Sequence, residues 1–260
     1  MPLGERPAGF CERLIQRPGV GRGRSVENEH EHGAHERSLA ARPRAAVPPA
    51  APPGECPGGW RSMRTVRAYI GLGANVGDAR ATLPAAVHAL AAMPGATLIG
   101  VSRLYVTAPV GVADQPEFHN AVAALDVPEG PGDAGSIALL LALKSIERAF
   151  GRQERYRYGP RELDLDLLIF GDAHITVERP EEGRSPDPAK ATRLLEVPHP
   201  EAARRLFVLA PLADLAPDLV PPGWSESVAA ARARRVSIEG ATAVRALARW
   251  DQAAERWVGE

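Results

Sequence analysis

Hydrophobic and polar positions follow two different periods from Val66 onward. Apolar residues recur at about every second position over 66–72, 96–107 and 117–127, which predicts three strands, the last two antiparallel to each other. Apolar residues three and four positions apart predict helices over 79–93 and 136–150. The run from Leu163 to Phe170 is apolar except for two aspartates and predicts a strand whose far end is buried on both faces.

Shorter elements are expected after this strand. Residues 174–177 and 194–197 predict short strands, and the charged, proline-rich stretch 178–192 between them predicts a surface loop. Two helical stretches, 226–235 and 242–257, would form a C-terminal helical extension over 223–260. Nothing in that extension indicates chemistry.

Residues 1–64 carry no pattern typical of a domain. They are rich in Pro, Gly and Arg, and the run from Val47 to Pro53 is incompatible with a helix or a central strand. Such a segment buries too little apolar surface to offset the entropy lost on ordering. We therefore expect a disordered tail, and a gene start assigned upstream of Met63 would account for it.

Two aspartates give the strand 163–170 its chemical interest. Asp164 and Asp166 are two positions apart, so in a strand their carboxylates point to the same face, about 6–7 Å apart. Two neighbouring carboxylates repel each other unless a cation lies between them. Hard oxygen ligands suit Mg²⁺, which usually takes further ligands from water and phosphate. A solvated face is the alternative interpretation of the two aspartates.

An arginine-rich loop leads directly into this strand. Four arginines stand within ten residues, and Gly159-Pro160 predicts a turn just before the strand. The arginines are Arg152, Arg155, Arg157 and Arg161. Guanidinium groups bind phosphate through a planar fork. A basic loop followed by a metal-binding strand is the layout expected for phosphoryl-type transfer from a nucleotide.

Composition excludes several other classes of protein. The formal net charge is −1 over 260 residues, so there is no general attraction to nucleic acid or anionic membranes. No stretch is long and apolar enough for a transmembrane helix. The two cysteines, Cys11 and Cys56, lie in the tail, so a disulfide framework is excluded for the folded part and a reducing cytoplasm is expected.

Three blocks of the sequence resemble one known family. The run R-Y-G-P-R-E-L-D-L-D-L-L resembles the signature of the 6-hydroxymethyl-7,8-dihydropterin pyrophosphokinases of the folate pathway. A T-x-P-x-G…Q-P-x-[FY]-x-N segment matches the family's pterin pocket, and V-P-H-P-x(4)-R-x-F-V-L-x-P-L matches its second block. The resemblance covers Val66 to about Val220, so we expect the pyrophosphokinase domain over 65–222.

The resemblance implies a fold, a reaction and a set of ligands. The fold would be α+β, with a ferredoxin-like, mixed and mainly antiparallel sheet covered by helices on both faces. The enzyme would be a diphosphokinase that transfers pyrophosphate from ATP to 6-hydroxymethyl-7,8-dihydropterin, with two Mg²⁺ ions. Its partners would be these small molecules, with no nucleic acid and no membrane, and we expect a cytoplasmic monomer.

The resemblance also assigns roles to individual residues. Catalytic roles fall to Arg152, Arg161, Asp164 and Asp166, of which Asp164 and Asp166 would hold the metal. The pterin would contact Thr107, Pro109, Val110, Phe118, Asn120 and Phe207. ATP would contact Glu147, Arg155, Tyr158, Arg161, His199 and Arg205.

Several of these assignments have structural alternatives. Phe118 with Asn120 fits a flat heterocycle as well as a core aromatic beside a turn-capping amide. His199 fits a helix N-cap, Phe207 a core position, and Glu147 a solvated helix face. The loop also departs from the family's G-R-x-R pattern, because its second arginine, Arg155, is displaced by one position.

The glycine-rich stretch 71–77 predicts a turn that caps the next helix, with a phosphate-binding loop as the alternative. A Rossmann-type oxidoreductase built on this stretch predicts an acidic residue that closes a second strand, and the strand 96–107 has none. An RNA-binding module would use exposed aromatics and arginines but leaves the paired aspartates unexplained.

Overall fold

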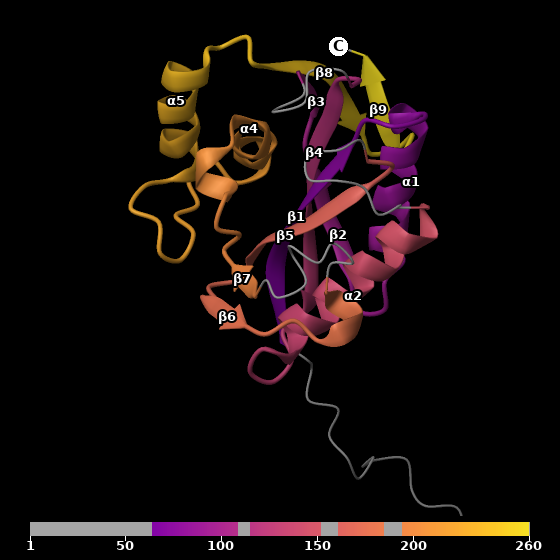
Figure 1. Ribbon diagram of the computed structural model, residues 1–260, viewed down its shortest axis with the longest axis vertical. Helices are drawn as coiled ribbons and strands as arrows, with labels where there is room; N and C mark the ends of the chain where they lie inside the picture. Colours follow the sequence, from indigo (N-terminus) through magenta and orange to yellow (C-terminus); the bar gives the residue numbers. More distant parts are fainter. Residues whose placement is uncertain (1–63, 109–114, 152–160, 185–193, 260) are drawn as a thin grey trace, which may run out of the picture. The chain divides into compact units, whose positions relative to one another are not determined.

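An antiparallel sheet lies at the centre of the computed structural model, which describes residues 64–108, 115–151, 161–184 and 194–259. These residues fall within one compact unit, 56–260. The sheet consists of β1 (Thr65–Ala74), β2 (Thr97–Val101), β3 (Leu104–Thr107), β4 (Phe118–Pro128), β5 (Asp164–Phe170), β8 (Val244–Asp251) and β9 (Arg256–Gly259). Its order is β5-β1-β4-β3-β8-β9, with β2 also paired to β4 (Figure 1).

The stretch 96–107, predicted as one strand, is divided into β2 and β3. Both segments pair with β4, so they form one sheet position with a break between them. At the break, the hydroxyl of the buried Ser102 accepts a hydrogen bond from the backbone N–H of Val122 at 2.9 Å. A serine thus takes a ladder position where regular pairing is interrupted.

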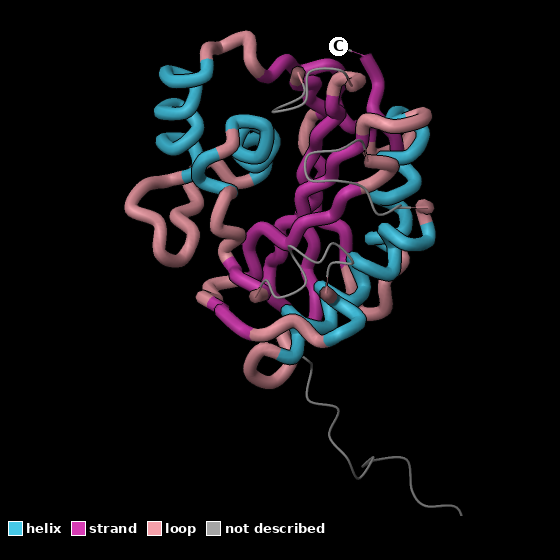
Figure 2. Tube along the Cα trace, viewed as in Figure 1, coloured by secondary structure: helices cyan, strands magenta, loops and turns pink. Residues whose placement is uncertain are grey.

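Four helices cover the two faces of the sheet in the described residues (Figure 2). Helices α1 (Ala79–Ala91) and α2 (Ala134–Ala149) pack on one face, and α4 (Leu206–Leu215) and α5 (Val228–Glu239) lie over the other. Asp78 caps α1, because its carboxylate accepts from Ala81 N at 3.1 Å. The expected three-layer arrangement, with a mainly antiparallel sheet between two helical layers, is confirmed.

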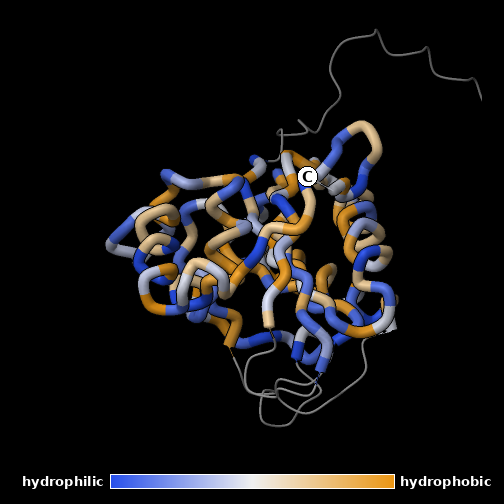
Figure 3. Tube along the Cα trace, turned by 90° about the horizontal axis from the view of Figure 1, so that it is seen from above, coloured by the Kyte–Doolittle hydropathy of each residue, from blue (hydrophilic) through white to orange (hydrophobic). Residues whose placement is uncertain are grey.

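Two hydrophobic cores follow from this layering (Figure 3). Alternate residues of β1 divide between them, since Ile70 and Leu72 face α1 and α2 while Tyr69 faces α4. Strand β5 does the same until a register shift at its pairing with β1, where Leu168 and Ile169 both join the α4 core. The far end of β5 is therefore buried on both faces, as its apolar run predicts.

A second sheet of two short strands stands beside the first. It pairs β6 (Ile175–Val177) with β7 (Leu195–Val197), both close to their predicted positions. The 3₁₀ turns η1 (Glu181–Gly183) and η2 (Ala202–Arg204) flank it, and the Val197–Pro198 peptide bond is cis. Residues 185–192 of the predicted surface loop lie outside the described residues.

The C-terminal extension is only half helical. The predicted helix 226–235 is confirmed as part of α5, but the predicted helix 242–257 is wrong, because these residues form the hairpin β8–β9. The open edge of β3 pairs with β8, and the Trp250 and Trp257 rings pack edge to face at 4.7 Å. Pairing with the edge of β3 therefore outweighs the helix preference of the alanines and arginines in V-R-A-L-A-R-W.

The predicted tail, residues 1–64, lies outside the described residues except for Arg64. Within the described segments, no helix has the length and apolar character that a membrane-spanning helix needs.

His119 on β4 makes the stability of the fold depend on pH. Its Nδ1 is buried without a hydrogen-bond partner in the described residues. Burial, followed by the charge of Arg80, lowers the pKa of His119, while Glu117 and Asp78 oppose this. Because the folded imidazole resists protonation, stability is complete above the unfolded pKa of about 6.5 and is lost as the pH falls below it.

We expect the free energy of unfolding of the wild type to fall more, between about pH 7.5 and about pH 5.5, than that of the His119→Leu variant. Urea unfolding at both pH values measures the difference. Parallel declines in the two proteins would contradict the assignment.

Candidate active site

Strand β5 places the two aspartates on one face of the sheet. Asp164 and Asp166 are half-buried, while Leu165 and Leu167 between and beyond them are buried in the core beside α2. This is the alternation predicted from the sequence. Asp164 pairs across the sheet with Gly73 and Asp166 with Gly71. Both carboxylates therefore stand beside positions of β1 that carry no side chain.

Gly71 and Gly73 belong to a strand, not to the predicted turn. β1 continues to Ala74, and the turn comes later, where Gly77 has φ +68°. A Cβ on Gly73 would lie 3.5 Å from the amide oxygen of Asn120 on β4. The surface over these two glycines, which we call the glycine floor, lies between the aspartates of β5 and the amide of β4. It is open at Gly73, and the Leu168 side chain borders it at Gly71, 3.4 Å from the position of a Cβ.

A buried pair from α2 holds the outer edge of β5. The carboxylate of Glu147, with 1% of its surface exposed, accepts from Leu165 N at 2.7 Å. Lys144 Nζ donates to the same carboxylate at 2.8 Å and to Leu165 O at 3.2 Å. Both backbone groups of the residue between the aspartates are therefore bonded by side chains. The burial of Glu147 contradicts its alternative interpretation as a solvated carboxylate, and its contact with ATP stays a prediction.

The Arg161 side chain contacts the first aspartate of β5, three residues further along the chain. Its Nη1 lies 2.5 Å from Asp164 Oδ2, and both side chains are 23% exposed. Asp166, in contrast, has no hydrogen bond or ion pair within the described residues. The arginine therefore neutralises one carboxylate of the pair and leaves the other open to a ligand.

Thr107 and Asn120, both predicted to bind pterin, lie together on the same face. They are 7% exposed, and Asn120 Nδ2 donates to Thr107 Oγ1 at 3.0 Å. Phe118 begins β4, pairs with Thr107 across the sheet and is half-buried. The amide, the hydroxyl and the ring thus form one side of the glycine floor.

Three predicted residues come from the segment after β7. His199 donates its backbone N–H to Leu168 O at 2.8 Å, and its Nδ1 accepts from Glu201 N at 3.2 Å. Because Nδ1 accepts, Nε2 carries the proton of the neutral ring and can donate to a ligand. The Arg205 guanidinium lies 5.8 Å from the centre of the half-buried Phe207 ring, at the start of α4.

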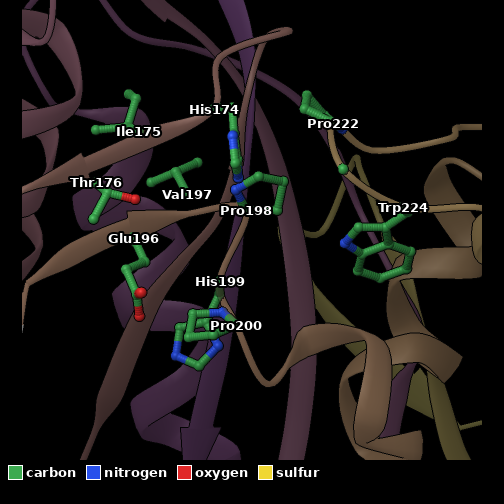
Figure 4. A pocket seen from close by; sticks show the side chains of 11 residues that line it. His174, Ile175, Thr176, Glu196, Val197, Pro198, His199, Pro200, Pro222 and Trp224 are labelled. Carbon is green, nitrogen blue, oxygen red and sulfur yellow. The ribbon is translucent and has the colours of Figure 1, made fainter.

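Two hollows meet at His199. The smaller one, about 20 Å³, is lined by Asp166, Lys144 and His199 together with Leu140 and Leu167. The larger one, about 210 Å³, lies on the other side of β7 between His174 and Trp224 (Figure 4). The smaller hollow is the one that joins a predicted metal ligand to a predicted ATP ligand, so it is the one that bears on the chemistry.

An ion-pair cluster fixes α4 to the sheet behind these groups. Asp214 accepts from Arg103 Nη2 at 2.7 Å and from Tyr105 Oη at 2.9 Å. Burial, then the charge of Asp214, raises the pKa of Tyr105 to about 12. The phenol therefore stays protonated and donates throughout the physiological pH range, which fixes α4, the helix that carries Phe207 in its first turn.

Five predicted site residues lie outside the described residues: Pro109, Val110, Arg152, Arg155 and Tyr158. Sequence reasoning missed Asn75, Lys144 and the glycine floor as parts of the site. The G-x-G spacing on a strand, which leaves alternate positions of one face empty, was the available signal for the floor.

The aspartate pair fits a divalent metal of the Mg²⁺ type. It offers two hard oxygen ligands on one half-exposed face, next to the open glycine floor. In the described parts of the chain, no group of three His, Cys, Asp or Glu side chains could hold a metal by itself. A metal bound here would take its remaining ligands from water and from phosphate oxygens.

The chain matches one family model and several curated relatives. The model describes 7,8-dihydro-6-hydroxymethylpterin-pyrophosphokinase and matches residues 69–217. A 2-amino-4-hydroxy-6-hydroxymethyldihydropteridine pyrophosphokinase of Pseudomonas aeruginosa is 44% identical over 156 residues, 60% of this chain and 84% of the relative. The enzyme of the same name from Methylorubrum extorquens is 40% identical over 173 residues, 66% of this chain and 97% of the relative.

Solved structures agree on the fold. Wild-type HPPK-DHPS of Plasmodium falciparum with pterin and p-hydroxybenzoate superposes with a TM-score of 0.57 at 16% identity. The match covers 76% of this chain and 49% of the other, so the chain spans about half of that protein.

Removal of Lys144 tests the support of β5. Lys144→Met removes the cation that donates to the buried Glu147 carboxylate and to Leu165 O, so the free energy of unfolding should fall by about 3–5 kcal/mol. The control is Arg67→Met, which breaks an Arg67–Asp126 pair of similar length, 2.6 Å, whose side chains are 41% and 33% exposed. It should cost no more than about 1 kcal/mol. Equal losses in urea unfolding would contradict a buried support.

Proposed function

The chain belongs to the 7,8-dihydro-6-hydroxymethylpterin-pyrophosphokinase family, and we propose how its described residues bring about the transfer. The enzyme is a diphosphokinase of folate synthesis that moves pyrophosphate from ATP to a hydroxymethyl-dihydropterin. The aspartate pair beside the glycine floor carries the proposal, because it puts a metal-binding face and an open, flat surface in direct contact.

The phosphates of ATP would lie at the hollow lined by Asp166, Lys144 and His199. At about 20 Å³ this hollow is too small for the base, so the base would lie outside its rim, where Glu196 is exposed. The phosphates would then extend towards Asp166, within reach of the Nε2–H of His199.

The pterin would lie on the glycine floor. Asn120 and Thr107 present a hydrogen-bonding edge there, suited to the polar rim of a pterin. Its edge would rest on the floor, so that Phe118 and Phe207 could cover its two faces. This arrangement directs the hydroxymethyl group towards the aspartates and therefore towards the phosphates of ATP.

In the transfer, the hydroxymethyl oxygen forms a bond to the β-phosphorus of ATP. The bond from that phosphorus to the oxygen shared with the α-phosphate breaks, AMP leaves with that oxygen and the electron pair, and the hydroxyl proton passes to water. We propose that Asp164 and Asp166 hold two Mg²⁺ ions, which would neutralise phosphate charge and lower the pKa of the attacking hydroxyl. Alignment of the two substrates would supply much of the remaining rate enhancement.

Arg161 would act on both sides of this step. Its guanidinium contacts and neutralises Asp164. A metal held by Asp164 and Asp166 would supply positive charge there, and the guanidinium could then bind the transferred phosphates, where planar donors match the developing charge. Arg205, half-buried beside Phe207, would add a second cation from α4. We further propose that the enzyme works as a cytoplasmic monomer; the lack of cysteines outside residues 1–64 supports the reducing compartment.

Replacement of Asp166 tests the metal assignment. Asp166→Ala should abolish AMP formation and leave the pterin Kd within about twofold of the wild type, because the carboxylate binds metal and not pterin. Asp172→Ala, which removes an exposed carboxylate from the turn after β5, is the matched control and should keep wild-type rates. Near-normal turnover of Asp166→Ala would refute the assignment.

A side chain on the glycine floor tests the pterin site. Gly73→Val should fold, because a Cβ there meets only ordinary contact distances, but its methyl groups would occupy the proposed pterin surface. We expect the pterin KM to rise by about tenfold or more. Gly259→Val on β9, where a Cβ meets nothing within 4 Å, controls for the substitution itself. A wild-type pterin KM in Gly73→Val would place the pterin elsewhere.

A further inference from the structure

Asn75 stands at the junction of the two halves of the site. It follows the last residue of β1, at the end of the glycine floor, and only 4% of its surface is exposed. A buried amide of this kind must satisfy both its donor and its acceptor groups. Its hydrogen-bond partners lie in two segments that are distant from it in sequence.

On one side Asn75 holds the backbone of Arg161. Its Oδ1 accepts from Arg161 N at 2.7 Å, and its own backbone N–H donates to Arg161 O at 3.0 Å. A third bond runs from Val76 N to Arg161 O at 3.1 Å. The main chain at Arg161 is therefore fixed three residues before Asp164, and so is the origin of the guanidinium that contacts Asp164.

The Asn75 side chain also bonds the segment just before β4, the strand that carries the predicted pterin ligands Phe118 and Asn120. Its Nδ2 donates to Gln115 Oε1 and to Pro116 O, each at 3.2 Å. Phe118 and Asn120 follow directly on β4. The amide cannot be turned over, because Arg161 N can only donate and Pro116 O can only accept.

We propose that Asn75 is a positioning residue that couples the pterin site to the metal and phosphate site. This inference rests on the substrate placement proposed above. One rigid amide sets the distance between the segment that carries Phe118 and the residue that carries the phosphate-binding guanidinium. Binding of either substrate therefore favours the geometry that the other needs, and the coupling is reciprocal.

Two substitutions separate the two sides of the amide. Asn75→Asp keeps an acceptor for Arg161 N but cannot donate to Gln115 and Pro116, so the pterin KM should rise more than the ATP KM. Asn75→Ala removes all three side-chain hydrogen bonds and leaves only the backbone bonds to Arg161 O. We expect kcat to fall by about 10²-fold, as when reacting groups are displaced by about 1 Å. Steady-state AMP formation with each substrate varied measures both effects.

Isothermal titration calorimetry measures the coupling itself. Pterin Kd is determined with and without Mg²⁺ and a non-hydrolysable ATP analogue. In the wild type the analogue should tighten pterin binding by about fivefold or more. In Asn75→Ala this ratio should fall towards one, while the protein remains folded. An unchanged ratio in Asn75→Ala would overturn the proposal.

Ser102→Ala is the control for a general loss of stability. Ser102 is 1% exposed and bonds Arg103 O and Val122 N, so it ties the same sheet without touching either segment that Asn75 holds. It should lower the melting temperature and leave the coupling ratio intact. If Ser102→Ala reduces the ratio as much as Asn75→Ala does, the role of Asn75 is structural only and the proposal is overturned. A wrong substrate placement would give a different result: the wild type would form AMP, and Gly73→Val would have the same pterin KM as the wild type.

Discussion

The site depends on keeping an edge strand that carries two carboxylates in one fixed position. Among the described residues, β5 has a strand neighbour in its sheet on one side only, β1. On the other side Glu147 and Lys144 bond both backbone groups of Leu165, and the backbone of His199 bonds Leu168 O. These contacts satisfy backbone N–H and C=O groups that a second strand would otherwise bond. They also block pairing of this edge with another chain. Without them, the carboxylates would lose their fixed spacing.

The pairing of β5 with β1 determines what lies beside the carboxylates. Glycines at the two facing positions of β1 keep the sheet surface open up to Asn120. A flat substrate can therefore approach the aspartates along the sheet rather than from above it. The two glycines bury little surface of their own, so β1 is held mainly through its opposite face, where Ile70 and Leu72 are buried in the core.

Sequence reasoning predicted what depends on local alternation. The shared face of Asp164 and Asp166, the strand that contains Asn120 and the two helices of the first layer all follow from periods of two and 3.6. It failed where a long-range partner decides. β8 is a strand because β3 offers it an edge, and Asn75 matters because segments 40 and 86 residues away meet at its amide. Composition and spacing carry no information on such meetings.

Product identity tests the account most directly. The enzyme is incubated with ATP, Mg²⁺ and 6-hydroxymethyl-7,8-dihydropterin, and the nucleotide products are separated. The account predicts AMP in a one-to-one ratio with pterin diphosphate, formed only with pterin present and abolished by EDTA. Formation of ADP, or of AMP without pterin, would contradict it.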